Sequence, residues 1–390
     1  MIAGMHTYFR LITRFYLLLF LFTTHACSNN ESRKPGRIDF QSGRVTYAER
    51  FSLLETDSCT ILNIIDPWQG AGNVIHQYFL VKDNPDFHPE IDQSRIIHVP
   101  VKRIICMSTT HLAMIKALGQ ESGIAGVSGA GFVYDEDISK RIKDGLINDI
   151  GYDSGINSEL IIKSSPDLVM IYGIGSESAG YTAKIYELGT KVMYNADYLE
   201  TDPLGKAEWI KVFGALFCQE KTADSLFSSI ESKYNQLKEY ISSNTGDKPA
   251  VMLGLPFRDT WYISPGNSYI SRLIRDAGGK YLWERTESSV SMPFGLENVY
   301  IESLNADFWL NTGGVLSKDE IVSIDPRLGS VPPFVKGKLF NNNKRLNSSG
   351  GNDYWESGTL NPHIILKDIA SILHPELFPE HEPVYYRKIE

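Results

Sequence analysis

The chain has 390 residues, of which 42% are hydrophobic, and a formal net charge of -9. This length allows two domains, each with its own core, so neither disulfides nor metal ions are needed to hold the fold together. The acidic balance argues against nucleic acid as the main partner, because nucleic-acid-binding domains carry an excess of Lys and Arg. The composition is compatible with a small-molecule ligand.

Residues 1–26 indicate an export signal rather than part of the fold. Arg10 and Arg14 precede the apolar run FYLLLFLF, which is too short to span a bilayer, and the small-residue stretch THAC ends at Cys27. This order resembles a bacterial lipoprotein signal, in which Cys27 is lipidated, although Thr24 stands where such signals usually carry leucine. The alternative is a plain cleaved signal followed by a free cysteine. Residues 27–43 are polar and lack periodicity, which is typical of a flexible tether.

Three cysteines remain, Cys59, Cys106 and Cys218, at wide and irregular spacing. None belongs to a C-x-x-C or zinc-binding pattern. Cys106 and Cys218 lie in apolar runs, which favours buried free thiols over the alternative of a disulfide.

Residues 44–101 predict a β-rich N-terminal extension with the character of a meander. The apolar runs 59–65 and 74–81 lack a helical period, and the turn cluster DPWQGAGN separates them. We expect these strands to pack on the edge of the first domain and to carry little information about a ligand.

From residue 102 onward, short apolar strands alternate with amphipathic helices, which predicts a layered α/β fold with mostly parallel sheets. We expect a first lobe over 102–221 and a second over 246–390. The segments DLVMIYG and DFWLNTG form a weak internal repeat, in which Asp167 and Asp307 each begin an apolar strand that reaches glycine six residues later. Two similar lobes imply a cleft between them.

A single helix over 222–245 is predicted to join the two lobes. It begins at a Thr or Asp cap, and apolar residues recur at spacings of three or four. These residues are Leu226, Ile230, Tyr234, Leu237 and Ile241.

Ligands of open α/β sheets lie beyond the carboxyl ends of the strands, so the segments that follow the strands contain the candidate site. The first such segment holds Ser108, Thr109, Thr110 and His111, whose hydroxyl and backbone N–H groups suit ligand binding. Aromatic residues dominate the others, and rings suit a broad, partly apolar ligand, although the alternative for each ring is an ordinary place in the core. They are Phe132, Tyr134, Tyr172, Phe257, Trp261, Tyr262, Phe294, Tyr354 and Trp355.

Arg258 lies beside these rings in PFRDTWY and is a candidate partner for an acidic group of the ligand. The alternative is a salt bridge to Asp259 or another surface acid.

Catalytic and metal-binding patterns are absent from the sequence. It contains no G-x-S-x-G, no G-x-x-x-x-G-K-[ST] and no H-E-x-x-H, and GVSGAGF has the wrong spacing for a dinucleotide fingerprint. His111 beside Ser108 or Thr109 lacks an orienting carboxylate, so a helix-capping role is favoured over nucleophilic catalysis or metal and haem ligation. We predict no catalytic residue, no metal ligand and no cofactor.

Four segments in the right order resemble the helical-backbone (class III) substrate-binding proteins of ABC importers, which handle iron siderophores, haem and cobalamin. They are RIICMSTTHLAMIKALGQESGIAGVSG, INSELIIKSSPDLVMIYG, SYISRLIRDAGGKYLW and GTLNPHIILKDIASILHPELF. The resemblance implies two Rossmann-like lobes, one long backbone helix, a shallow cleft and limited closure on binding.

The resemblance also implies one surface glutamate on each lobe that pairs with arginines of the permease. Glu177 and Glu320 stand at the matching places, with solvated loop acids as the alternative for both. Such contacts orient docking more than they strengthen it.

The sequence therefore predicts a lipid-anchored, monomeric, periplasmic binding protein that captures a metal chelate or corrinoid and delivers it to an ABC permease. The alternatives are an envelope enzyme on the same two-lobed plan, which needs a redox centre or a catalytic triad, and a scaffold lipoprotein that binds no small molecule.

Overall fold

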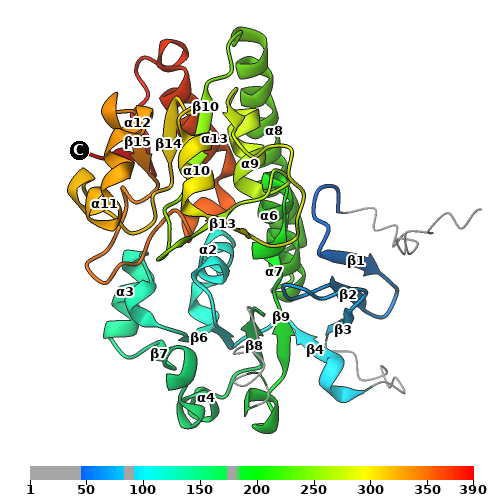
Figure 1. The fold of residues 1–390 in the computed structure, drawn as a ribbon. Helices are drawn as coiled ribbons and strands as arrows, with labels where there is room; N and C mark the ends of the chain where they lie inside the picture. The colour runs from blue at the N-terminus through cyan, green and yellow to red at the C-terminus, as the bar shows by residue number, and fades with distance from the viewer. Residues whose placement is uncertain (1–44, 83–91, 174–181, 183) are drawn as a thin grey trace, which may run out of the picture. The chain divides into compact units, whose positions relative to one another are not determined.

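The computed structural model describes residues 45–82, 92–173, 182 and 184–390. The predicted signal, the tether with Cys27, and Glu177 lie outside the described residues. Residues 42–390 belong to one compact unit, which contains an N-terminal sheet and two α/β lobes (Figure 1).

The N-terminal sheet has the strand order β1-β2-β3-β4. Strands β1 to β3 are antiparallel, as a meander requires, but β4 pairs parallel to β3. The strands are β1 (Phe51–Glu55), β2 (Thr60–Ile65), β3 (Ile75–Lys82) and β4 (Ile96–Val99). The prediction of two strands in this region is correct, and the structure adds the first and the last.

The first lobe is built on a parallel sheet with the order β7-β6-β5-β8-β9. Its central strands are buried on both faces, which explains their continuous apolar runs. The strands are β5 (Ile104–Cys106), β6 (Ile124–Val127), β7 (Asn148–Asp149), β8 (Leu168–Ile171) and β9 (Val192–Tyr194). The helices are α2 (Thr109–Ala117), α3 (Glu136–Lys143), α4 (Ser158–Ser164), α6 (Pro203–Glu208) and α7 (Ile210–Leu216).

The second lobe repeats this plan with the strand order β12-β10-β14-β15-β16, in which only β16 is antiparallel to its neighbour. The strands are β10 (Ala250–Leu253), β12 (Lys280–Tyr281), β14 (Phe308–Leu310), β15 (Leu339–Asn341) and β16 (Arg387–Lys388), and a separate hairpin pairs β11 (Thr260–Ile263) with β13 (Met292–Gly295). The helices are α9 (Tyr269–Asp276), α10 (Leu296–Ser303), α11 (Lys318–Ile324), α12 (Pro332–Val335) and α13 (Pro362–Leu373).

The weak internal repeat has a structural cause in both lobes. The Asp167 carboxylate accepts the backbone N–H groups of Lys102 and Arg103 at 2.8 and 2.9 Å, just before β5. The Asp307 carboxylate accepts the N–H of Ala250 at 2.9 Å, at the start of β10. Each aspartate therefore fixes the start of the strand that neighbours its own.

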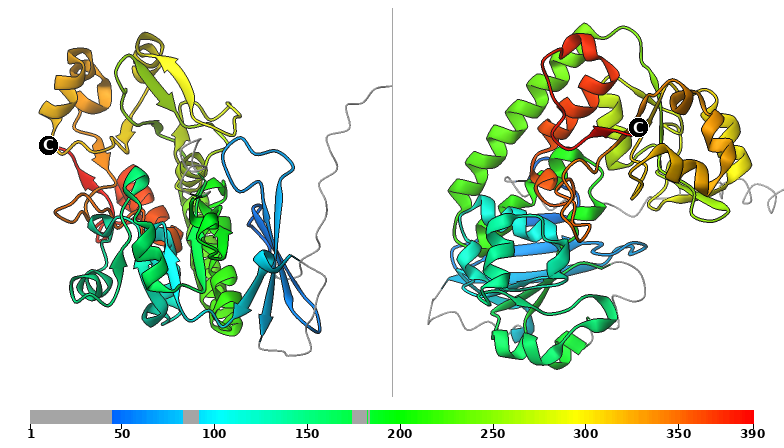
Figure 2. Two further views of the ribbon diagram at one scale, coloured as in Figure 1. Left: turned by 90° about the horizontal axis from the view of Figure 1, so that it is seen from below. Right: turned by 90° about the vertical axis from the view of Figure 1, so that its left-hand side faces the viewer.

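The long helix α8 (Glu220–Asn244) contacts α7 of the first lobe and α9 and α13 of the second, and Figure 2 shows it running alongside both. It begins two residues before the predicted start and has no side-chain cap. Its buried face contains Ala223 and Phe227 in addition to the predicted Ile230, Tyr234 and Ile241, whereas Leu226 and Leu237 are half-buried.

Cys59, Cys106 and Cys218 are free thiols, with Cys106 buried and the other two half-buried. Within the described ranges, no helix is long and apolar enough to cross a membrane.

Candidate ligand-binding site

A cavity of about 860 Å³ lies between the two lobes. Its wall includes residues that directly follow β10, β14 and β15 of the second lobe, together with residues 198–201, which come after β9 of the first lobe. This is where open α/β sheets bind their ligands.

Two other hollows of similar size lie elsewhere in the described part of the chain. The larger, about 1080 Å³, includes Pro249 and Asp307 at the amino ends of the second-lobe strands. The other, about 950 Å³, is lined by α2, α3 and α8 together with the loop before α13. No described residue that directly follows a strand lines either of these two hollows, whereas three strands of the second-lobe sheet lead directly into the wall of the interlobe cavity, which is therefore the candidate site.

Aromatic rings and small polar groups line the interlobe cavity. The rings are Tyr198, Tyr262, Tyr269, Tyr354 and Trp355, and several serines and asparagines accompany them. Tyr262 and Trp355 keep 56% and 52% of their surface exposed, so they present ring area to a ligand. Asn311 Oδ1 and Asn342 Nδ2 are buried in this wall without a hydrogen-bond partner among the described residues.

Three basic side chains from three parts of the chain also line the cavity. Arg50 of the N-terminal extension lies 3.7 Å from Asp66, and Arg272 of α9 lies 2.9 Å from Asp202. Lys206 of α6 is only 8% exposed, and its ammonium lies 5.4 Å from the centre of the Tyr269 ring. Burial lowers the pKa of Lys206, and the buried carboxylate of Asp197 partly offsets this effect.

The N-terminal extension forms part of the cavity wall through Glu49, Arg50 and Gln69. From the sequence, the extension is expected to carry little information about a ligand and is not placed in this wall. The sequence shows only where the extension lies along the chain, whereas the wall depends on how the extension packs in three dimensions.

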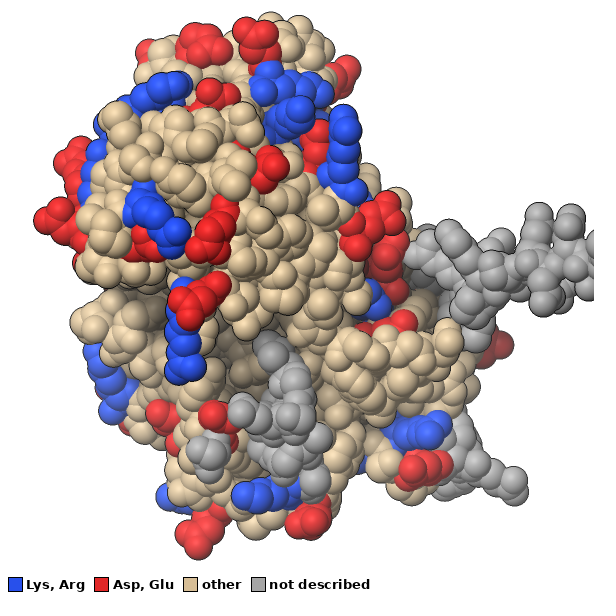
Figure 3. Space-filling view, in the orientation of Figure 1, with Lys and Arg blue, Asp and Glu red and all other residues tan. Residues whose placement is uncertain are grey.

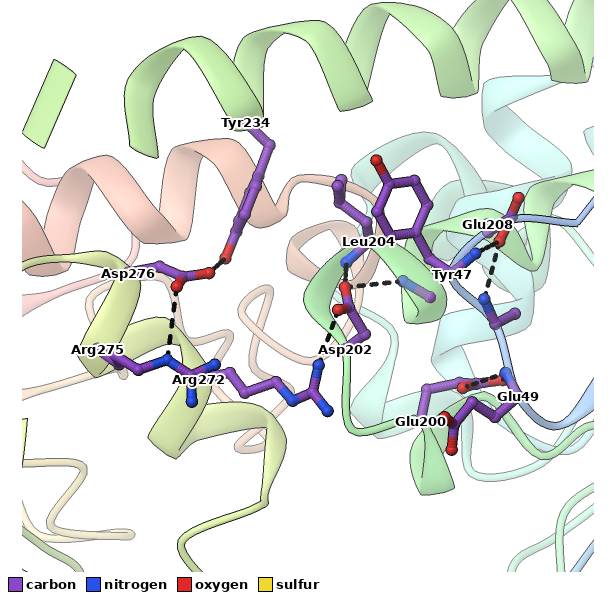
Figure 4. A network of polar contacts seen from close by, with 12 residues as sticks. Tyr47, Glu49, Glu200, Asp202, Leu204, Glu208, Tyr234, Arg272, Arg275 and Asp276 are labelled. Carbon is purple, nitrogen blue, oxygen red and sulfur yellow. Dashed lines mark hydrogen bonds and ion pairs between the residues drawn. The ribbon is translucent and has the colours of Figure 1, made fainter. Parts of the chain in front are cut away.

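Two buried carboxylates fasten the extension to the first lobe (Figure 4). Glu208 accepts the backbone N–H groups of residues 46–48 at 2.7 to 2.9 Å, together with the Lys211 ammonium at 2.7 Å. Glu200 accepts the N–H groups of Glu49 and Arg50, both at 2.9 Å, and the indole N–H of Trp209 at 3.0 Å. Burial raises the pKa of Glu200 to about 7, although these hydrogen bonds act in the opposite direction.

Three of the predicted ligand contacts line the cavity, namely Tyr262, Tyr354 and Trp355. Trp261 is not one of them, because it is fully buried and its indole N–H donates to the Leu253 carbonyl at 3.1 Å. Phe294 is its half-buried partner in the β11–β13 hairpin and packs on the core.

The segment from Ser108 to His111 also lies outside the cavity wall. Ser108, not His111, caps α2: its hydroxyl accepts the Thr110 N–H at 3.3 Å. Thr110 is buried and Thr109 is half-buried. His111 is fully buried without a hydrogen-bond partner among the described residues, and burial lowers its pKa to about 3. Its ring therefore packs, uncharged, in the core, which removes it from the candidate ligand contacts.

Phe132 and Tyr134 lie at a direct contact between the lobes rather than in the cavity wall. Glu356 of the second lobe accepts the Tyr134 N–H at 2.8 Å, and Asn347 Nδ2 donates to the Gly131 and Val133 carbonyls at 2.9 Å. Tyr172 is half-buried beside Tyr198, with ring centres 6.5 Å apart.

Arg258 is exposed in a tight turn, with a left-handed backbone (φ 55°) and its guanidinium 5.3 Å from the Phe257 ring. Neither Arg258 nor Phe257 lines the cavity, and no ion pair joins Arg258 to Asp259 among the described residues. Sequence reasoning selected Arg258, whereas the basic side chains that line the cavity are Lys206, Arg272 and Arg50.

Two parallel-sheet lobes joined by one helix, with a lined cavity at the carboxyl ends of their strands, define the two-lobed class of solute-binding proteins. Residues 104–337 match the family described as periplasmic binding protein, and the chain belongs to that family.

Similar structures and relatives agree with this assignment. A possible iron-binding periplasmic solute-binding protein from Staphylococcus epidermidis has a TM-score of 0.55 at 17% identity, over 70% of this chain and 99% of that one. A periplasmic haem-binding protein from Pseudomonas aeruginosa has a TM-score of 0.56 at 13% identity, over 74% and 98%. An uncharacterized lipoprotein of Methanocaldococcus jannaschii is 28% identical over 88% of this chain and 84% of its own length, and a second is 26% identical over 89% and 87%.

Proposed function

We propose that the chain is a lipid-anchored substrate-binding protein that captures an iron chelate (siderophore or haem) or cobalamin and delivers it to an ABC permease. The observation that carries this proposal is the interlobe cavity, whose volume of about 860 Å³ falls in the range of small-molecule sites, roughly 300 to 1,000 Å³. Its tyrosine and tryptophan rings suit a large ligand with planar or apolar surface.

The names of similar proteins support the same ligand class and the same location. One similar structure binds haem, and two relatives are lipoproteins. A lipid on Cys27 would hold the chain at the membrane and leave the cavity accessible in the periplasm. The protein would act by binding and release as a monomer, with no chemical step on its ligand.

We further propose that acidic residues on each lobe, Glu177 and Glu320, orient the protein on the permease. Glu320 is exposed on α11, although its carboxylate also accepts the Leu316 N–H at 3.0 Å while its own N–H donates to Ser317. This capping arrangement supports the start of the helix as well. A Glu320→Gln variant should therefore lower ligand uptake by a reconstituted permease without changing ligand affinity, whereas Asp319→Asn should change neither.

Tryptophan fluorescence tests the ligand assignment. Haemin, cyanocobalamin and a panel of ferric siderophores are titrated into the full chain in detergent, with correction for ligand absorption and with calorimetry as an independent measure of affinity. Saturable one-to-one quenching by one of them identifies the ligand.

Two variants then place the ligand in the protein. Trp355→Phe removes the indole that lines the cavity and should lose most of the quenching, whereas Trp283→Phe, a buried tryptophan outside the cavity wall, should retain it. Absence of binding to every member of the panel would exclude this ligand class.

A further inference from the structure

The N-terminal extension and the ligand cavity share one backbone segment. Residues 46–50 are bound through consecutive N–H groups to Glu208 and Glu200, and the same segment turns Glu49 and Arg50 toward the cavity. Figure 4 shows this segment beside Asp202 and Arg272, which links the first lobe to α9 of the second. The extension is thus held at the junction of both lobes.

A second contact fixes the extension on the other side of Arg50. Trp68 forms an isolated parallel bridge with Gly173, which lies just after β8, and Tyr198 donates its hydroxyl to the Gly173 carbonyl. Gln69, next to Trp68, lines the cavity. Two separate stretches of the extension therefore enter the wall, and both are tied to the first lobe.

Lys206 faces this shared wall as a buried cation without a direct partner. The described residues supply no hydrogen bond or ion pair to its ammonium, and its contact is the face of the Tyr269 ring at 5.4 Å. Asp197 is also buried, and its Oδ2 atom has no hydrogen-bond partner among the described residues. An ammonium group has three hydrogen-bond donors. When it is buried without acceptors, no hydrogen bond offsets the free-energy cost of its desolvation.

On the face drawn in Figure 3, basic and acidic side chains are interspersed rather than gathered in one patch of a single sign. Inside the cavity, Arg272 is neutralised by Asp202, and Arg50 lies at the longer distance of 3.7 Å from Asp66. Lys206 and Arg50 are therefore the cations with the most remaining capacity to bind an anion.

From these contacts we infer that the N-terminal sheet is a third wall of the ligand site, and that the site takes a ligand with an anionic oxygen group, which binds Lys206 with Arg50 as the second cation. A carboxylate, a phosphate or a catecholate meets this requirement, because each offers charged oxygen acceptors to an ammonium and a guanidinium. This inference rests on the proposed function, since it specifies the ligand of the same cavity.

Substitution of the two cations tests the inference in the full chain. The probes are haemin, with two carboxylates; cyanocobalamin, with a phosphodiester; a ferric tricatecholate; and a ferric trihydroxamate that has no net negative charge. Lys206→Met should weaken binding of the anionic probe roughly tenfold to hundredfold, because it removes a charge-assisted hydrogen bond in a desolvated site. Arg50→Gln should weaken it less, by roughly threefold to tenfold, because that side chain is partly exposed.

Matched controls separate a local effect from a general change of charge. Arg95→Gln and Lys82→Met each remove one positive charge from the N-terminal extension outside the cavity wall, and both should leave affinity unchanged. Thermal unfolding of each variant reports whether it folds. If Lys206→Met does not fold, the affinity of the Arg50→Gln variant for the anionic probe decides the test.

The outcomes distinguish this inference from the proposed function. If the wild-type chain binds only the trihydroxamate, and Lys206→Met binds it equally well, the inference fails while the proposed function stands. If both cavity variants bind an anionic probe as tightly as the wild-type chain does, the inference fails as well. If the wild type binds none of the probes, the proposed function fails and the inference with it.

Discussion

Replacement of Glu208 by alanine should release the N-terminal extension from the first lobe. Glu208 is fully buried and accepts four hydrogen bonds, three from residues 46–48 and one from Lys211. Removal of one member of a buried ion pair costs about 3 to 5 kcal/mol, and here it also deprives three backbone N–H groups of their acceptor. Since small globular proteins are stable by only about 5 to 15 kcal/mol, we expect a loss in this range to be readily measured.

Urea unfolding, followed by circular dichroism, measures the change in the free energy of unfolding. Limited proteolysis reports whether the cleavage sites around residues 46–50 become accessible before the lobes unfold. Glu231→Ala is the matched control, because Glu231 also contacts the extension, through the Tyr47 hydroxyl at 2.7 Å, but from a half-buried position on α8. That single contact is worth about 1 kcal/mol. Equal losses in the two variants would refute the argument that the buried Glu208 carboxylate anchors the extension.

Three further predictions concern stability and localisation. Burial raises the pKa of both Glu200 and Glu356 to about 7, from an unfolded value near 4.5, so the folded state binds a proton more tightly and its stability should fall as the pH rises from about 4.5 to 7. The loss is up to about 3 kcal/mol for each group; urea unfolding at several pH values measures it, and a flat profile would contradict it. Gly173→Ala should destabilise the fold by about 1 to 3 kcal/mol, because the new Cβ would lie 2.7 Å from Trp68 Cβ; an unchanged melting temperature would show that the contact relaxes freely. Cys27→Ser should abolish incorporation of labelled fatty acid and shift the protein from the membrane to the soluble fraction, and retention in the membrane would argue against the lipid anchor.

The sequence predicted the layers of the fold because its signals are local. Continuous apolar runs indicated buried parallel strands, and the spacing of apolar residues indicated α8. The repeat around Asp167 and Asp307 was visible because each aspartate makes the same contact: its carboxylate accepts a backbone N–H at or just before the start of the neighbouring strand, β5 or β10. The bounds of α8 were less accurate, since its N-terminus has no side-chain cap to mark it.

The site was harder to predict because neighbouring residues on a strand face opposite sides. Trp261 and Tyr262 are adjacent in β11, so only one of them can face the cavity, and the sequence does not specify which. Lys206 lies in the stretch PLGKAEW, which has the appearance of an ordinary surface helix. In the structure every residue of α6 is buried, and the Lys206 ammonium lies 5.4 Å from the centre of the Tyr269 ring of the other lobe. Arg50 lies at the cavity where its backbone N–H donates to the carboxylate of Glu200, which is 150 residues away in sequence. No local sequence pattern encodes a contact over that separation.

In the proposed binding mode, the shared segment at residues 46–50 couples occupancy of the cavity to attachment of the extension. A ligand that contacts Arg50 binds the attached form more tightly than the detached form, so it shifts the balance toward attachment. If the detached form binds threefold to tenfold more weakly, as expected for loss of the Arg50 contact, a saturating ligand makes the detached population smaller by the same factor, which corresponds to about 0.7 to 1.4 kcal/mol. Protease resistance of the N-terminal sheet would then serve as a reporter of whether the protein is loaded.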